Sequence, residues 1–185
     1  MIPENPRTHK TTFRIVQSSL IGIPSPTALK SQRFPGVRMG SDPVIGSHCI
    51  IFGNVFIGNR FRCGDNVFIR DNTAIGDEVA IGDWSFIDKD VVVGDKVTIG
   101  DEVWIPRTTR IDSRVTVGPH VKFLTEGDVK GSYQKTRGII LEEGCIIGKS
   151  AVINPGICIG AGAVVAEGTV VTDNIPADMN RVKNC

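Results

Sequence analysis

The sequence is poor in the residues that most often carry catalysis, with three histidines and one tyrosine among 185 residues. Basic and acidic residues nearly balance, at a net charge of +1, and no basic run occurs, so nucleic acid and membrane are not expected as partners. No apolar stretch approaches the length of a membrane span. The five cysteines form no CxxC pair and no signal peptide is visible, so we expect a cytoplasmic protein without disulfides.

What the sequence does contain is an aliphatic residue at every sixth position, often followed by glycine. The in-phase positions are Ile45, Ile51, Ile57, Cys63, Ile69, Ile75, Ile81, Ile87, Val93, Ile99, Ile105, Ile111, Val117 and Phe123. After a gap the phase resumes at Leu141, Ile147, Ile153, Ile159, Val165 and Val171. Neither a helix nor an alternating strand gives this spacing, whereas hexapeptide repeats are typical of a parallel β-helix.

The predicted fold is therefore all-β, a triangular prism in which three hexapeptides make one coil and the aliphatic residues point inward. Branched Ile and Val pack well on such a pleated surface. Residues eighteen positions apart are expected to stack in columns, about 4.8 Å from coil to coil. The Gly, Asn or Asp after each inward residue is expected at a corner, because these residues tolerate unusual φ values.

We predict one domain with three parts. Residues 1–38 lack the repeat and are interpreted as an arm or cap over the first coil. Residues 39–174 form the β-helix, interrupted by a polar loop at residues 124–138, and residues 175–185 form a tail. A long irregular loop in so regular a solenoid is more often functional than accidental. The sequence leaves open whether this loop replaces part of a coil or bulges between consecutive faces.

Two of the three histidines fall in one predicted corner column, which contains His48, Asn66, Trp84, Glu102 and His120. Glu102 is expected one coil from His120, within reach of a hydrogen bond. A histidine held by a carboxylate next to a loop is a candidate general base near neutral pH. The alternative interpretation is an ordinary solvated corner pair.

The loop adds Glu126 and Asp128, which could accept a proton or hold a substrate ammonium or hydroxyl group. Solvated acidic turn residues are the alternative.

A second, outward-facing column contains Phe68, Phe86, Trp104 and Lys122. Three stacked aromatic residues predict a subunit interface or a substrate platform, and we favour the interface because symmetry often encloses such stripes.

Several segments resemble one known family. They are Gly64-Asp65-Asn66-Val67-Phe68-Ile69-Arg70, Ile105-Pro106, Val117-Gly118-Pro119-His120-Val121, the run from Gly144 to Gly156, and the run from Gly160 to Pro176. From about Gly58 onward the chain is similar to the hexapeptide-repeat acyltransferases, which are left-handed parallel β-helix enzymes using acetyl-CoA or another acyl-CoA. Among them it resembles those acting on nucleotide-linked amino sugars.

The resemblance implies a left-handed prism, a homotrimer with active sites between adjacent prisms, and an acyl-CoA groove beside the later coils. Small residues in that groove would let the pantetheine arm approach the backbone, and cations would meet the CoA phosphates. The small residues are Gly160, Ala161 and Ala166, and the cations are Lys149, Arg181 and Lys183.

The chain departs from the family pattern at the expected catalytic positions. Relatives that acylate hydroxyls carry a histidine in or beside the loop, where this sequence has Asp128, and amino-sugar relatives more often have Asn at the position of His120. An amine acceptor needs a weaker base than a hydroxyl. We therefore predict acetylation of the amine of a nucleotide-linked amino sugar, without a metal, with His120, Asp128, Glu102 and Glu126 as candidate catalytic residues.

Three alternatives compete with this prediction. An O-acetyltransferase for a sugar hydroxyl and a non-catalytic β-helix scaffold or binding protein stay open, because fold does not imply function. A zinc site of the γ-class carbonic anhydrase type needs three histidines. Here His48 and His120 are four coils apart, roughly 19 Å at the strand spacing, so this alternative is rejected.

Overall fold

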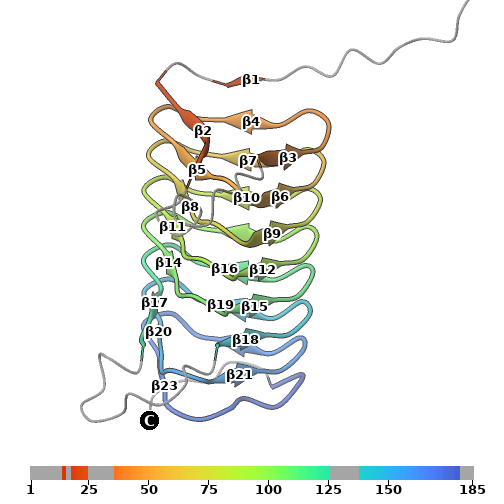
Figure 1. Ribbon diagram of the computed structural model, residues 1–185. Helices are drawn as coiled ribbons and strands as arrows, with labels where there is room; N and C mark the ends of the chain where they lie inside the picture. Colours follow the sequence, from red (N-terminus) through yellow and green to blue (C-terminus); the bar gives the residue numbers. More distant parts are fainter. Residues whose placement is uncertain (1–13, 16–17, 25–35, 126–137, 180–185) are drawn as a thin grey trace, which may run out of the picture.

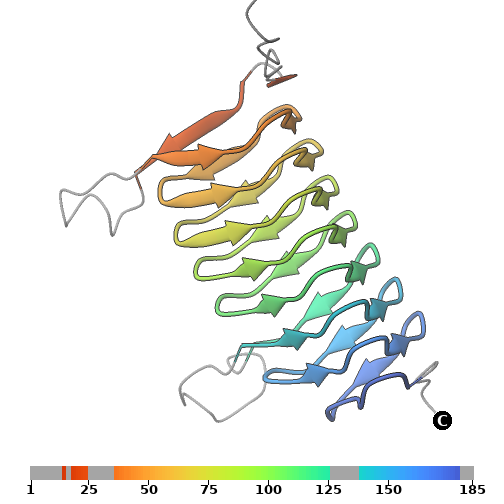
Figure 2. The same ribbon diagram turned by 90° about the vertical axis from the view of Figure 1, so that its right-hand side faces the viewer.

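A computed structural model describes residues 14–15, 18–24, 36–125 and 138–179, whose strands wind into a three-sided parallel solenoid (Figures 1 and 2). The all-β left-handed parallel β-helix predicted from the sequence is confirmed. Three sheets form the sides, here called sheets A, B and C in the order in which the chain visits them. Strands in each sheet pair in parallel with the coils before and after.

Most strands are two residues long and each sheet is a stack of one strand per coil. Sheet A contains β1 (Arg14–Ile15), β4 (Val44–Ile45), β7 (Arg62–Cys63), β10 (Ala80–Ile81), β13 (Thr98–Ile99), β16 (Thr116–Val117), β19 (Ile146–Ile147) and β22 (Val164–Val165). Sheet B contains β2 (Leu20–Ile23), β5 (Ile50–Phe52), β8 (Phe68–Ile69), β11 (Phe86–Ile87), β14 (Trp104–Ile105), β17 (Lys122–Phe123), β20 (Val152–Ile153) and β23 (Val170–Val171). Sheet C contains β3 (Val37–Met39), β6 (Val55–Ile57), β9 (Thr73–Ile75), β12 (Val92–Val93), β15 (Arg110–Ile111), β18 (Ile140–Leu141) and β21 (Cys158–Ile159).

The core contains two buried positions per hexapeptide. The predicted inward residues are confirmed, for example Ile99, Ile105 and Ile111, whose side chains are almost fully buried. The residue two positions before the inward residue, such as Val97 before Ile99 or Val103 before Ile105, is also buried and supplies a second stack that the sequence analysis did not predict. Each side of a coil therefore contributes two side chains to the prism interior.

Most corners contain four residues, and the third of them typically has a positive φ, for example 57° at His120 and 55° at Glu102. The expectation that the glycine after the inward residue has an unusual φ is wrong, since Gly64 and Gly100 have none. These glycines are needed for close approach between coils. A Cβ atom on Gly100 would lie 2.5 Å from the backbone nitrogen of Pro119, and one on Gly64 would lie 1.8 Å from Asp83 Oδ1.

Described residues of the predicted arm extend the sheets. β1 pairs with β4, β2 with β5 and β3 with β6, all in parallel. The solenoid pairing therefore begins before residue 39, the first residue of the predicted β-helix. In Figures 1 and 2 these strands lie at the end of the prism opposite the last coil.

The interruption lies between two consecutive faces, which answers the question that the sequence left open. The chain leaves sheet B after β17 and resumes in sheet C at β18. Phe123 pairs with Ile153, and Leu141 pairs with Ile111, so both sheets continue in register across the interruption. Phe123 and Leu141 are eighteen positions apart, against six for Ile105 and Ile111 one coil earlier, so the loop inserts twelve residues into one coil.

Candidate functional site

The two residues of the predicted catalytic pair lie at the turns between sheets A and B, here called the A–B corner. His120 Nδ1 is 3.4 Å from Glu102 Oε2, and the two side chains are 53% and 62% exposed. The contact predicted from the eighteen-residue column is confirmed. Because Nδ1 faces the carboxylate, Nε2 is the ring nitrogen left to exchange a proton with a ligand.

The backbone fixes this pair from coil to coil. The His120 amide donates to the carbonyl of Asp101 at 2.9 Å, and the Glu102 amide donates to the carbonyl of Asp83 at 2.8 Å. Both residues have the positive φ of the third corner position. Their side chains therefore leave a rigid corner in the same direction, one coil apart, which accounts for their contact.

A ladder of aspartates ends where this pair is located. In the coils before this pair, the backbone N–H of the second corner residue donates a hydrogen bond to an aspartate side chain of the next coil. Asp65 N–H donates to Asp83 Oδ1 at 2.8 Å, and Asp83 N–H donates to Asp101 Oδ1 at 2.9 Å. The next residues in this column are Pro119 and Lys149, neither of which supplies a carboxylate. From Pro119 onward, the second corner residues therefore do not connect successive coils through aspartate side chains.

Two residues proposed for cofactor binding share this corner with His120. Lys149 follows Pro119 in the column, and its Nζ lies 3.2 Å from Glu167 Oε2 with both side chains exposed. Ala166 precedes Glu167, and its backbone lies beside Gly148. The structure therefore brings His120, Lys149 and Ala166 to one corner, and their catalytic and binding roles stay predictions.

Gly160 and Ala161 lie elsewhere, at the turns between sheets C and A, the C–A corner. The Ala161 amide donates to Glu142 Oε2 at 3.0 Å. A Cβ atom on Gly160 would lie 2.4 Å from the backbone nitrogen of Ala177, so chain packing alone requires glycine there. Within one copy of the chain, these two residues are separated from the His120 corner by the width of sheet A.

Four further candidates cannot be placed. Glu126 and Asp128 of the loop, and Arg181 and Lys183 of the tail, lie outside the described residues.

The outward column of aromatic residues is confirmed on sheet B. Phe68 pairs with Phe86 and Phe86 with Trp104, with 6.0 Å between the two phenyl centroids.

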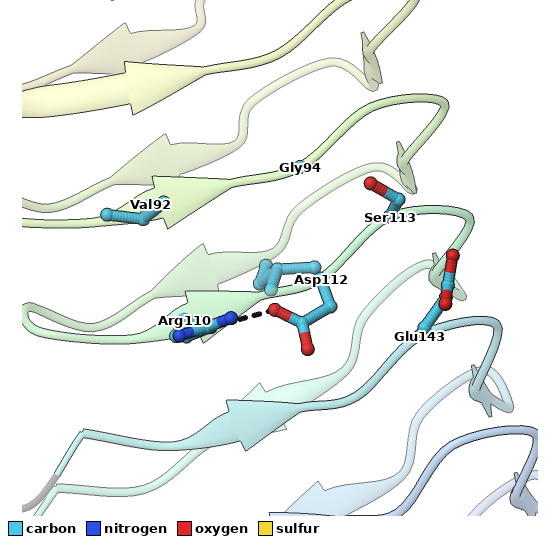
Figure 3. A pocket seen from close by; sticks show the side chains of 7 residues that line it. Val92, Gly94, Arg110, Asp112, Ser113 and Glu143 are labelled. Atoms are coloured by element: carbon cyan, nitrogen blue, oxygen red, sulfur yellow. Dashed lines mark hydrogen bonds and ion pairs between the residues drawn. The ribbon is translucent and has the colours of Figure 1, made fainter.

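Two of the surface cavities that the described residues line were not predicted from the sequence. One, of about 420 Å³, lies over sheet C and the C–A corner and is shown in Figure 3. Its polar side chains include Arg110 on β15, whose Nε lies 2.8 Å from Asp112 Oδ1, and Glu143 from the following coil. Because Arg110 is already neutralised by Asp112, and Glu143 by Arg114, this cavity offers no unpaired charge to a ligand.

The other cavity, of about 390 Å³, adjoins the His120–Glu102 pair. It is lined by Trp84, Phe86, Glu102, Val103 and Trp104. Sequence analysis named four of these residues but in separate columns. Their spacing along the chain could have shown that they are neighbours, because residues 84–86 and 102–104 are eighteen positions apart and so lie in adjacent coils.

Comparison with solved structures identifies a protein of the same architecture. A Bacillus cereus protein with a provisionally assigned acetyltransferase activity matches over 89% of this chain and 80% of its own length, with a TM-score of 0.53 and 21% identity. The two proteins share a fold. At this identity the likeness concerns the fold alone, and the hexapeptide-repeat architecture inferred from the sequence is thereby confirmed.

Other similar structures have lower TM-scores. The polySia-specific acetyltransferase NeuO matches 76% of this chain and 74% of its own, with a TM-score of 0.42 and 19% identity. A perosamine N-acetyltransferase variant from Caulobacter crescentus, in complex with CoA and GDP-perosamine, matches 90% of this chain but 50% of its own, with a TM-score of 0.39 and 17% identity. No family model and no curated protein matches the chain.

None of the described residues belongs to a helix long and apolar enough to cross a membrane. Within the same residues, no group of three or more His, Cys, Asp or Glu side chains is placed to hold a metal ion.

Proposed function

We propose that the protein is an acyl-CoA-dependent acyltransferase that acetylates the amine of a nucleotide-linked amino sugar in the cytoplasm. The observation that carries the proposal is the His120–Glu102 pair, exposed at a corner where the aspartate ladder has ended. Lys149 lies one coil further along the same corner and is suited to a CoA phosphate. The fold shared with a B. cereus protein of provisionally assigned acetyltransferase activity is consistent with this chemistry.

The reaction needs one proton acceptor. The neutral amine nitrogen attacks the thioester carbonyl, a C–N bond forms, the C–S bond breaks, and CoA leaves as the thiolate. His120 Nε2 takes the proton lost from the nitrogen, and the Glu102 carboxylate stabilises the resulting imidazolium ion. That proton is then available to the departing thiolate, so the enzyme ends the cycle unchanged. Asp128 and Glu126 remain candidates for the same proton or for holding the acceptor.

A homotrimer is part of the proposal. Within one chain, Lys149 and Ala166 lie at the A–B corner, whereas Gly160 and Ala161 lie at the C–A corner. A second prism set against sheet A would place one copy's A–B corner near the other's C–A corner. Both groups of proposed CoA contacts could then serve one ligand between subunits, as closed cyclic symmetry allows.

One observation favours a second candidate, O-acetyl transfer to a sugar hydroxyl. A hydroxyl must lose its proton as it attacks, and a histidine oriented by a carboxylate is the usual arrangement for that task. Acceptor screening distinguishes the two candidates. Amino sugars and their N-blocked analogues would be compared as substrates.

The test is acetyl-CoA binding by calorimetry, together with the mass of the protein in solution and thiol release in the presence of acceptors. We expect micromolar binding at about one site per chain in a trimer. Thiol release that requires a free amine would support the N-acetyl assignment. A protein that does not bind acetyl-CoA would contradict the proposal and favour a scaffold.

A further inference from the structure

The only two tryptophans of the chain line the same cavity. Trp84 and Trp104 form it together with Phe86, Val103 and Glu102, in a volume of about 390 Å³. Trp84 belongs to the A–B corner, whereas Trp104 is the first residue of β14. Indoles from two different elements thus border one hollow, with the Phe86 ring beside Trp104 in sheet B.

Packing does not explain Trp84. Its side chain is 66% exposed, so it buries little apolar surface. It also has a φ of 57°, a backbone conformation that is unfavourable for a bulky residue. The same corner position holds polar residues in neighbouring coils, namely Asn66 and Glu102. Because other third corner positions, such as Glu102 and His120, share this φ, it is the exposed aromatic side chain itself that points to a binding role.

The chemistry of the cavity selects its ligand. Exposed indole faces bind flat aromatic rings by stacking. Glu102 brings a carboxylate to the rim, and among the described side chains its ion-pair partner is His120. This carboxylate would repel an anionic group. A purely apolar ligand would bury the carboxylate without offering it a hydrogen-bond donor, which is unfavourable. A planar ring that carries N–H groups satisfies both the indoles and the carboxylate.

We propose that the Trp84–Trp104 cavity binds the base of a nucleotide, stacked on indole and with a base N–H donating to Glu102. The proposal rests on the acyltransferase function above and identifies where its nucleotide is held. Two sources of such a base are consistent with the site, the nucleotide of the amino-sugar acceptor and the adenine of CoA. Either one would be anchored next to His120, because Glu102 contacts that residue.

Intrinsic fluorescence tests the proposal directly, because every tryptophan of the chain lies in the cavity. The probes are UMP, CMP, GMP, TMP, AMP and CoA, with ribose 5-phosphate and choline as compounds without a base. We expect saturable quenching by at least one nucleotide and none by ribose 5-phosphate or choline. Quenching by CoA and AMP alone would assign the adenine, and quenching by another nucleotide would assign the acceptor.

Variants make the test specific. Trp84→Ala and Trp104→Ala should each weaken nucleotide binding by about 5- to 150-fold, since stacking on one aromatic residue contributes about 1–3 kcal/mol. The matched control is Phe56→Ala, an aromatic residue on sheet C that is 46% exposed and should leave affinity unchanged. Calorimetry on the folded variants, checked by circular dichroism, supplies the affinities.

Three results would overturn the proposal: no saturable quenching by any base-containing probe, equal quenching by choline, or unchanged affinity in both tryptophan variants. Thiol release separates this proposal from the one on which it rests. Acetyl transfer to an amino sugar without nucleotide quenching overturns the base site and leaves the acyltransferase standing. Quenching by a nucleotide without thiol release on any acceptor leaves the base site standing and overturns the acyltransferase function.

Discussion

His120 and Glu102 contact each other across one coil of the prism, with 3.4 Å between Nδ1 and Oε2. The same relationship joins Arg60 and Glu78 at the C–A corner, where both residues also occupy third corner positions. Pairs of opposite charge thus stack in corner columns, and stacking alone does not make a site. What distinguishes His120 is an imidazole ring, which can both accept and donate a proton, next to a cavity that its partner Glu102 lines.

The first prediction concerns this pair. His120→Ala should lower kcat/KM for acetyl transfer by about 100-fold or more, the usual contribution of a general base, and Glu102→Gln should lower it by a smaller factor. Glu78→Gln is the matched control, because it removes a carboxylate from an equivalent corner pair. The measurement is steady-state thiol release. Unchanged rates in His120→Ala would remove this residue from the mechanism.

The second prediction concerns Lys149. Its Nζ is paired with Glu167 and exposed, so a phosphate could replace that carboxylate as its partner. Lys149→Ala should weaken CoA binding about tenfold, as expected for a hydrogen bond to a charged group. Lys96→Ala, an exposed lysine at a C–A corner, is the control. Calorimetry with CoA and with dephospho-CoA would show which phosphate is involved, and equal affinities in both variants would contradict the assignment.

The hexapeptide phase predicted the fold and every column before the loop, including the Glu102–His120 contact. It could not predict the columns after the loop. The twelve inserted residues are a multiple of six, so the phase of the aliphatic residues survives while each later residue moves to another face of the prism. Counting by eighteen would stack Leu141 under Phe123, whereas it lies on sheet C beside Ile111. For the same reason the sequence could not reveal that Lys149 lies at the same corner as His120.

The role of the corner glycines was missed for a different reason. Sequence reasoning treats a glycine as a source of conformational freedom, but spacing along the chain contains no information on how closely successive coils approach. The third prediction follows from that closeness. At Gly76 a Cβ atom would lie 2.7 Å from the carbonyl carbon of Gly94.

Gly76→Ala should therefore lower the free energy of unfolding by about 1–3 kcal/mol, as overpacking does. Gly36→Ala is the control, because an added Cβ there meets no atom within 4 Å. Urea denaturation of both variants measures the difference. Equal midpoints would show that the coils separate without strain, contrary to this account.

The last prediction concerns Cys145, whose buried thiol occupies the position before β19. Burial raises the pKa of this thiol from 9.0 to about 12, because the thiolate would lose its hydration. In the unfolded chain the thiol ionises near its ordinary pKa. Between these two values the unfolded state binds fewer protons than the folded state, so stability must fall as pH rises. Well below pH 9 both states keep the proton, and Cys145 contributes no pH dependence.

Cys145→Ala tests this linkage with little change in packing, since Ala151 and Ala163 occupy equivalent buried positions. The free energy of unfolding of the wild type should fall more steeply than that of the variant between about pH 9 and about pH 11. Near neutral pH the difference between the two proteins should be constant. The comparison isolates Cys145, because Cys63, whose pKa is also raised, is present in both proteins. Parallel curves across the alkaline range would mean that the folded state admits water to the thiol, so the prism interior at this coil would not be closed.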